Sequence, residues 1–393
     1  MSMERGRIQI SGFDTERVTE RESLSDWMEE SGERTEGRWR RAWRRFRANR
    51  SAMIGLVVVT IMTVLTLLAE PIVIEGVKVQ PISLALHDPN NILWLHGYPN
   101  VEAYSAPIVT AAIDSWTVNL FGASFDMPWL HINGFPFGTD NQARDLYSRV
   151  IFGGRYSLSI GFVVVFITAT VGIVYGAVSG YYGGKVDEVM MRILDVIFAF
   201  PGLILALVIV AMLGKGYWQL VAAFSIFGWA GYARLIRGEI LSVKENEYVL
   251  AAKALGARDR SVIFRHIVPN ALAPVIVQAS LAIGTVVIGV AALGFLGLGF
   301  ASGTPEWGTM LDQTRATLIQ GPDQSISLMP SVTFADSSVT ISFPNPDGAI
   351  PWWATVFPGG AIFLFVMAMN LIGDGINDAL DAQEDVNLRG GGG

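Results

Sequence analysis

The chain has 393 residues, of which 51% are hydrophobic and 16% are charged, whereas average soluble domains have roughly a quarter of their residues charged. Its apolar residues are gathered into long uncharged runs, which argues against a water-soluble protein and favours one built for lipid. The absence of cysteine excludes a disulfide framework and a thiolate metal site. The formal net charge of −7 is less informative than the placement of the charges.

The N-terminal stretch, Met1 to about Gly37, is polar and mixed in charge, and no apolar segment follows a basic start as in a signal peptide. We interpret it as a disordered or loosely docked cytoplasmic tail. The next segment, Arg38 to Arg50, is basic and aromatic and directly precedes the first apolar run. The simpler interpretation is orienting charge with an interfacial aromatic anchor, and the alternative is a lipid-binding or regulatory helix.

Six uncharged runs approach the roughly 20 residues that a helix needs to cross a bilayer. The fifth run contains Pro269 and Pro274 near its start, so its helix is expected only from about Leu272 to Gly299. None of the runs alternates as a membrane barrel strand would, which predicts helices. The runs are Ser51–Ala69, Tyr156–Tyr182, Val196–Gly214, Gly216–Ala233, Ile267–Pro305 and Ala349–Gly373.

Two charge asymmetries agree on the orientation of these spans. The basic segment before the first span places the N-terminus in the cytoplasm, and six spans return the C-terminus to the same side. Between spans four and five, the predicted cytoplasmic segment carries Arg234, Arg237, Lys244, Lys253, Arg258, Arg260 and Arg265, whereas Ala301 to Ala349 contains only Arg315. The chain is therefore expected to be a multi-pass protein of the cell membrane.

This pattern predicts an all-α integral membrane protein with long extracytoplasmic loops. A β-hairpin is expected in the second large loop, where Ser331–Phe334 and Val339–Phe343 flank a turn. The external loops could form a docking surface for a partner or a stabilising cap, and the sequence favours neither. The predicted parts are a tail (1–50), a first span (51–70), an external loop (71–150), a core of five spans (151–376) with a coupling loop (234–270) and an external insertion (301–350), and a cytoplasmic tail (377–393).

The cytoplasmic segment Ser242 to Asn270 predicts a short helix, a glycine turn and a second short helix. Ser242 and Glu245 have the spacing of a capping box, and Gly256 lies where a helix would close with a left-handed residue. Asp259 is a candidate second N-cap, and Pro269 is expected to end the second helix. One face of the first helix is expected to present Tyr248, Ala251, Ala252 and Leu255, ringed by Lys253, Arg258 and Arg260.

The run from Glu247 to Ala257, followed by Ile267 to Asn270, resembles the EAA loop of ABC importer permeases, and in its local wording the dipeptide and oligopeptide permease family. In that family the loop forms coupling helices that sit in a groove of the ATPase subunit. Leu250 departs from the general motif, which has Glu there, and His266 and Val268 replace its Ile and Leu. The resemblance implies an ATPase-coupling role for Tyr248, Ala251, Ala252, Lys253, Leu255, Gly256, Ala257, Arg258 and Pro269.

Other stretches resemble the same family: Pro136–Asp145, Asp195–Pro201, Leu293–Gly299 with Trp307 and Gly308, and Asn370–Gly375. The likeness covers about Arg38 to Ala382 and is closest to the C-type member of the permease pair. It implies a second homologous permease, two cytoplasmic ATPases and an extracytoplasmic solute-binding protein as partners, with short peptides as substrates. Nickel or sugars are the alternative substrates, and no nucleic-acid partner is expected.

The chain lacks the residues that would let it supply its own energy. Neither Gly184-Lys185 nor Lys215 fits a P-loop, so ATP and magnesium are expected in the partner ATPases and no cofactor in this chain. The four histidines are scattered without metal-ligand spacing. Because the runs lack ionisable residues, an ion-coupled secondary transporter is the less favoured alternative. Hinges or close packing are expected at Pro201, Gly294, Gly297, Gly299 and Pro358.

Overall fold

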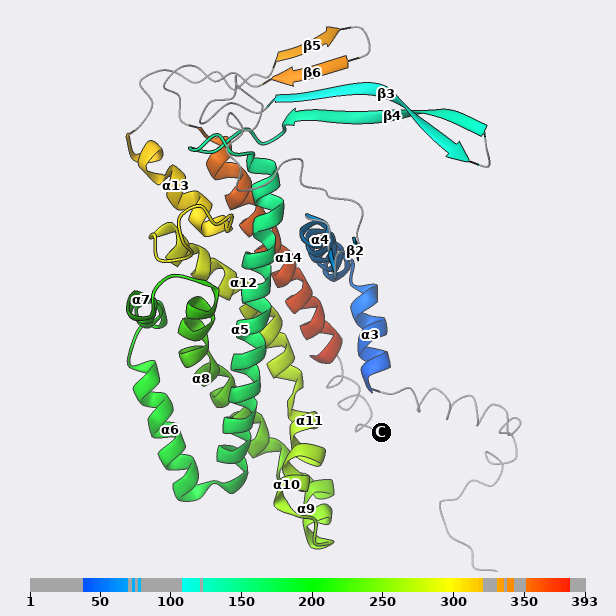
Figure 1. Cartoon of the computed structure of the whole chain (residues 1–393). Coiled ribbons are helices and arrows are strands. Elements are labelled where there is room, and N and C mark those ends of the chain that lie inside the picture. Colours follow the sequence, from blue (N-terminus) through cyan, green and yellow to red (C-terminus); the bar gives the residue numbers. More distant parts are fainter. Residues whose placement is uncertain are drawn as a thin grey trace, which may run out of the picture.

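The computed structural model is a bundle of long helices with β-strands at one end and a short helical elbow at the other (Figure 1). Among the described residues, five helices are long and apolar enough to cross a membrane: α4 (Arg50–Leu67), α5 (Leu146–Tyr182), α8 (Tyr217–Val243), α12 (Ala273–Phe295) and α14 (Trp353–Asp381). The structure describes residues 38–69, 73–74, 77–78, 108–120, 123–320, 331–335, 338–342 and 351–381. The predicted tails before residue 38 and after residue 381 lie outside this part of the chain.

The third predicted span is broken. It covers the end of α6 (Gly184–Phe198) and all of α7 (Gly202–Leu213), which meet at an angle of 78°. Pro201 is the N-cap of α7, and since proline has no backbone N–H it cannot continue the hydrogen-bond ladder of α6. The sixth crossing is therefore this bent pair, if the two helices together count as one span.

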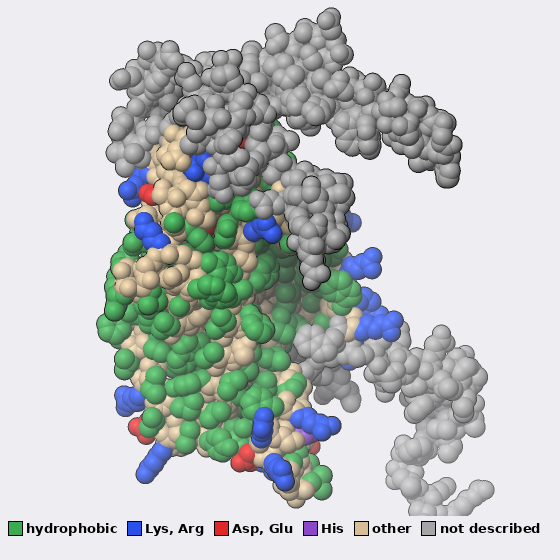
Figure 2. All heavy atoms as spheres, in the orientation of Figure 1, with side chains coloured by type: hydrophobic (Ala, Val, Ile, Leu, Met, Phe, Trp, Pro, Cys, Tyr) green, Lys and Arg blue, Asp and Glu red, His purple; other side chains and the backbone are tan. Residues whose placement is uncertain are grey.

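Three of the spanning helices, α5, α8 and α14, are longer than the apolar runs that predicted them. The 37 residues of α5 would extend about 55 Å, well beyond the roughly 30 Å of a hydrocarbon core. Similarly, α8 continues past Ala233 to Val243 and carries Arg234 and Arg237 on its last turns. Figure 2 shows apolar side chains over the middle of the molecule and basic ones toward both ends. The helices therefore project beyond the apolar belt.

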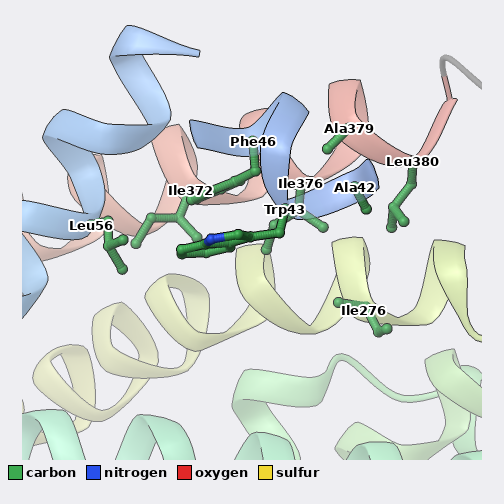
Figure 3. Close-up of a pocket in the computed structure, with 9 residues that line it drawn as sticks. All are labelled: Ala42, Trp43, Phe46, Leu56, Ile276, Ile372, Ile376, Ala379 and Leu380. Carbon is green, nitrogen blue, oxygen red and sulfur yellow. The ribbon is translucent and has the colours of Figure 1, made fainter. Parts of the chain in front are cut away.

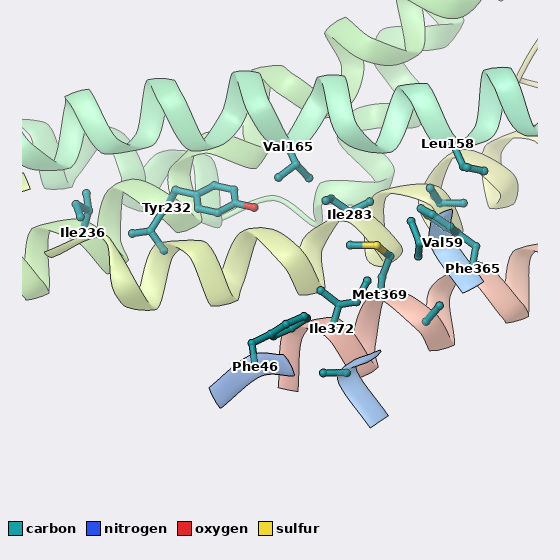
Figure 4. Packing of buried hydrophobic residues seen from close by; sticks show 14 of the residues in the cluster. Phe46, Val59, Leu158, Val165, Tyr232, Ile236, Ile283, Phe365, Met369 and Ile372 are labelled. Atoms are coloured by element: carbon teal, nitrogen blue, oxygen red, sulfur yellow. The ribbon is translucent and has the colours of Figure 1, made fainter. Parts of the chain in front are cut away.

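Small residues let these helices approach closely, as is typical of packing in lipid, where no hydrophobic effect drives helices together. On α5, Gly172, Gly176 and Gly180 lie one turn apart and face the backbone of α8. On α4, Gly55 is so close to α14 that an added Cβ would lie 2.6 Å from the Ala368 carbonyl oxygen. Larger side chains from α3 (Arg38–Ala48), α4, α5, α8, α12 and α14 fill the spaces between (Figure 4).

The opposite end from the elbow carries the strands. The hairpin predicted in the second large loop is present as β5 (Ser331–Ala335) and β6 (Ser338–Ser342). It pairs with a long hairpin from the first loop, β3 (Ile108–Leu120) and β4 (Ala123–Phe135), in the antiparallel order β4-β3-β6-β5. A separate pair joins β1 (Val73–Ile74) to β2 (Val77–Lys78). The helical class holds for the membrane part, and the sheet is an addition that the sequence did not predict beyond one hairpin.

A cluster of buried charged side chains connects separate segments at the strand end of the bundle. Asp140, in the turn before α5, contacts Arg144 at 2.7 Å and Arg149 at 3.3 Å, and all three side chains are almost wholly buried. Arg144 also donates to Gln313 on α13 (Trp307–Gln320) at 3.2 Å, and Arg149 donates to the Gly303 carbonyl oxygen at 3.1 Å. The stretch Pro136–Asp145, which resembles the permease family, thus helps to connect α5 to the segment that follows α12.

Candidate functional site

The predicted cytoplasmic segment forms an elbow that joins α8 to α12. It consists of α9 (Glu247–Ala254), a turn, α10 (Asp259–Ser261), a π-helical turn (Val262–Ile267) and α11 (Val268–Ala271). In Figure 1 the elbow lies at the end of the molecule opposite the strands, beyond the last turns of α5 and α8. We define the elbow as residues 246–271.

Gly256 closes α9 as predicted. Its φ of +79° lies in the left-handed region that favours glycine. The Gly256 amide donates to the Lys253 carbonyl at 2.9 Å and the Ala257 amide to the Ala252 carbonyl at 3.1 Å. This pair of bonds is the Schellman motif, which satisfies the last carbonyls of a helix and reverses the chain sharply. The turn between the two short helices is therefore fixed by glycine.

The predicted start signals of the two helices were wrong by a few residues. Ser242 lies inside the last turn of α8 and forms no capping box, because α8 continues through the position where a helix start was expected. Asn246 is the N-cap of α9, and Arg258, with extended backbone, precedes α10. Asp259 is the first residue of α10, and its carboxylate accepts a hydrogen bond from α5.

Pro269 does not end the second helix as predicted. It lies in the first turn of α11, directly after the π-helical turn. A proline in a helix removes one backbone donor and crowds the carbonyl four residues earlier, and the wider π turn accommodates both effects. Pro269 therefore lies on the path from the elbow to α12, apart from the glycine turn that carries the other candidate coupling residues.

Four apolar residues that the sequence analysis did not single out anchor the elbow. Val249 of α9 is fully buried, and Val262, Ile263 and Ile267 of the π turn are buried with it in the main core. The α9 sequence gives no local signal for this, because the neighbouring Tyr248 and Leu250 are also large and apolar but are exposed. These contacts hold α9 against the bundle by one face and leave its other face outward.

The outward face of the elbow is more apolar than predicted. Leu255, beside the glycine turn, is 88% exposed, and Leu250 and Tyr248 are 52% and 44% exposed. Ala251 is exposed and Ala252 and Ala257 are half-buried, so the expected small-residue face is present but does not protrude most. Lys253, Arg258 and Arg260 are exposed around it. An apolar tip with a basic rim is the composition of a protein-docking surface.

Polar contacts tie this tip to the end of α5. The Tyr181 hydroxyl donates to the Asp259 carboxylate at 2.7 Å, and the Lys253 ammonium lies 4.7 Å from the centre of the Tyr181 ring. Nearby, Lys244 donates to the Gly180 carbonyl at 3.1 Å. Tyr181 therefore links the end of α5 to both α9 and α10.

Comparison with known proteins assigns the fold that carries this elbow. Residues 172–384, more than half of the chain, match the family described as "Binding-protein-dependent transport system inner membrane component". The chain belongs to this family. Residues 37–90 also match "N-terminal TM domain of oligopeptide transport permease C". The matches place the elbow, α5 from Gly172 onward and all later spans inside the permease domain, which makes this chain a membrane subunit of a transport system.

Individual relatives cover nearly the whole permease. The dipeptide transport system permease protein DppC of Alkalihalophilus pseudofirmus is 33% identical over 87% of this chain and 89% of its own length. The glutathione transport system permease protein GsiD of Shigella dysenteriae is 35% identical, and the oligopeptide transport system permease protein OppC of Bacillus subtilis is 30% identical, over similar shares. This chain is similar to permeases from three differently named transport systems.

The five candidate hinge or packing residues of the permease lie away from the elbow. Gly294 and Gly299 pack against each other and against the start of α13. Gly297, with φ of +76°, closes α12 in a second Schellman motif, in which Leu298 donates to the Leu293 carbonyl. Pro201 marks the α6–α7 break, and Pro358 lies inside α14, which continues past it. Whether any of them flexes stays a prediction.

Proposed function

We propose that this permease is one half of the translocation path of an ATP-driven peptide importer and that its elbow is the docking site for a cytoplasmic ATPase subunit. The observation that carries the proposal is the exposed tip around Leu255. The Gly256 turn fixes its position, and the hydrogen bond between Tyr181 and Asp259 connects it to α5. Large exposed apolar side chains ringed by charge mark protein contacts, and this tip projects beyond the apolar belt.

The orientation of the chain follows from its charges in this proposal. The exposed basic residues of the elbow lie at the end of the molecule opposite the strands, and the arginines of α3 lie between the two ends, beside α14 (Figure 1). By the positive-inside rule the basic end is cytoplasmic, so both termini are cytoplasmic and the sheet is outside. This orientation presents the elbow to a soluble nucleotidase and the sheet to a solute-binding protein.

In the mechanism we favour, closure of two ATPase subunits around ATP and magnesium pushes on the elbow. The push reaches α5 through Tyr181, and α8 through the short chain link at 244–246. The α8 residue Arg237 makes a bidentate ion pair with Asp187 of α6, so α5, α6 and α8 receive the movement together. Two permeases driven this way would rock between inward-open and outward-open states.

The partners in this proposal are a second, homologous permease, two ATPases and an external binding protein. Short peptides are the proposed substrates, because relatives named for dipeptide, oligopeptide and glutathione transport all align over most of this chain. Nickel and sugars remain the alternative substrates, and the binding protein would select among them. The chain itself is proposed to need no cofactor and to hydrolyse no ATP.

Gly256 offers a direct test of coupling. Valine at a left-handed position costs more than the roughly 1–2 kcal/mol estimated for an ordinary residue, so Gly256→Val should distort the turn that presents Leu255. In proteoliposomes containing the full complex, we expect ATP-driven uptake of a labelled dipeptide to fall at least about tenfold while membrane insertion is kept.

Gly238→Val is the matched control, because Gly238 is exposed, helical and open to an added side chain. It should leave uptake close to that of the unchanged complex. Equal uptake by the two variants would contradict the coupling role of the elbow. Uptake by this chain alone, driven by a sodium or proton gradient, would instead establish a secondary transporter.

A further inference from the structure

An apolar pocket opens where α3 meets the ends of the membrane helices. Its volume is about 320 Å³, near the lower end of the roughly 300–1,000 Å³ that ligand pockets occupy. Figure 3 shows residues of α3, α4 and α14 gathered on one side, with Ile276 of α12 across from them. The lining residues, all apolar, are Ala42, Trp43, Phe46, Leu56, Ile276, Ile372, Ile376, Ala379 and Leu380. None of them belongs to the elbow.

The pocket lies near the start of α4 and the end of α14, two helices long and apolar enough to span a membrane. The spanning helix α4 begins at Arg50, so Leu56 lies about 9 Å along its axis, and α14 ends at Asp381, directly after Leu380. The Asn49 side chain donates to the Asp378 carboxylate at 3.0 Å and holds the α3–α4 junction against α14. The α3–α4 junction and the end of α14 therefore frame the cavity together.

Trp43 marks the open side of this pocket. Its indole is 55% exposed, although it stacks on the buried Phe46 ring with centroids 5.7 Å apart. A tryptophan with one face on protein and the other outward is typical of the membrane interface, where its ring contacts acyl chains. Hydrocarbon is the chemistry that this lining accepts, because a peptide or sugar would leave its polar groups without partners.

Charge on α3 supplies the second half of the site. Arg40 and Arg47 lie three residues before and four residues after Trp43, which places them on the same side of the helix, and both are exposed. Arg41 and Arg45 lie two residues from Trp43 and face the other way. The α3 sequence contains no acidic residue. Guanidinium groups bind phosphate through paired, charge-assisted hydrogen bonds.

We propose that this pocket binds an anionic phospholipid, with an acyl chain against Trp43, Leu56 and Ile276 and the headgroup phosphate between Arg40 and Arg47. The anionic class follows from the excess of positive charge on α3, which has no acidic residue, whereas the nearby Asp378 carboxylate of α14 already accepts a hydrogen bond from Asn49. The inference does not depend on what the permease transports, so it can stand or fall separately from the proposed importer function.

The test uses the full chain in detergent, titrated with dioleoyl phosphatidylglycerol or dioleoyl phosphatidylcholine, with melting temperature as the readout. Phosphatidylglycerol should raise the melting temperature more than phosphatidylcholine. Arg40→Gln with Arg47→Gln should raise the half-saturating phosphatidylglycerol concentration about 30-fold, from the loss of two arginines near an anionic lipid. Arg41→Gln with Arg45→Gln removes the same charge and should leave it unchanged.

Ile276→Trp fills the pocket from α12 and should reduce the response to lipid, so the pocket is tested even if the α3 variants fail to fold. Equal responses to the two lipids would overturn the proposal. Equal losses in the two arginine pairs would also overturn it, because they would indicate general attraction of a basic helix to a charged surface. A full response in Ile276→Trp would show that no acyl chain occupies the cavity.

Discussion

Glu306 is a single buried side chain that connects two helices at the strand end of the bundle. It is 1% exposed, and burial raises the pKa of its carboxyl, while four hydrogen bonds oppose that effect. One carboxylate oxygen accepts from the Ser157 hydroxyl and the Gly308 amide, and the other accepts from the amide and hydroxyl of Thr309. Glu306 thus joins α5 to the first turn of α13, where a negative charge also suits the helix dipole.

Glu306→Gln is expected to lower the free energy of unfolding by about 1–3 kcal/mol. In either amide orientation, the new NH₂ group would face a backbone donor, so one hydrogen bond is lost and a buried N–H is left without an acceptor. Denaturant unfolding in detergent measures the change. Asp312→Asn on α13, whose carboxylate is 29% exposed and lies 3.7 Å from Arg315, should change the free energy of unfolding by less than about 0.5 kcal/mol. Equal stability of the two variants would contradict the role given to Glu306.

Tyr181 is the residue that the structure adds to the candidate site, and its hydroxyl can be tested alone. Tyr181→Phe keeps the ring beside Lys253 but removes the hydrogen bond to Asp259. We expect amide exchange in α9 and α10 to speed up by roughly fivefold, which corresponds to about 1 kcal/mol of local stability. Tyr182→Phe removes a neighbouring hydroxyl from a ring that is 54% exposed, and should leave exchange there unchanged. Faster exchange in both variants would rule out a specific link.

Among the helices, the close contact between α4 and α14 depends on a glycine, which has no side chain to keep the helices apart. A Cβ added at Gly375 would collide with the Cβ of Ala52, whereas one added at Gly360 on the same helix meets nothing within 4 Å. Gly375→Ala should therefore destabilise the protein by about 1–3 kcal/mol through overpacking. Gly360→Ala should be neutral or slightly stabilising, because alanine favours helix more than glycine does. Thermal unfolding of the two variants distinguishes these outcomes, and equal melting temperatures would contradict the packing.

Helix positions were predictable from sequence, and helix ends were less so. In the described part of the chain, five uncharged runs coincide with the five helices able to span, because lipid requires apolar side chains and an internally bonded backbone. The runs underestimated the lengths of α5 and α8. A helix that leaves the membrane keeps its backbone hydrogen bonds, but its side chains become polar. The glycine turn was predictable because only glycine suits φ of +79°, whereas the buried face at Val249 depends on contacts distant in sequence.

At the scale of the whole molecule, the parts that sequence reasoning missed join distant segments. The sheet pairs Ile108 with Ser342, and the ionic cluster around Asp140 brings Gln313 beside Arg144. No local pattern encodes either partner. The predicted basic rim of the elbow is nevertheless present, with Lys253, Arg258 and Arg260 exposed, and the strands form at the opposite end of the molecule. In the proposed importer, the elbow end would face the ATPases and the strand end would face the solute-binding protein.

The most direct test of the account is a crosslink from the elbow tip. The chain contains no cysteine, so Leu255→Cys introduces a single attachment point for a photoreactive benzophenone maleimide. In membranes containing the full complex, illumination should yield an adduct with the ATPase subunit, and its yield should change when ATP and magnesium are added. Phe166→Cys, at a 74% exposed position in the middle of α5, should yield no such adduct. Absence of an ATPase adduct from position 255, or an adduct there with an external binding protein, would contradict the coupling role of the elbow.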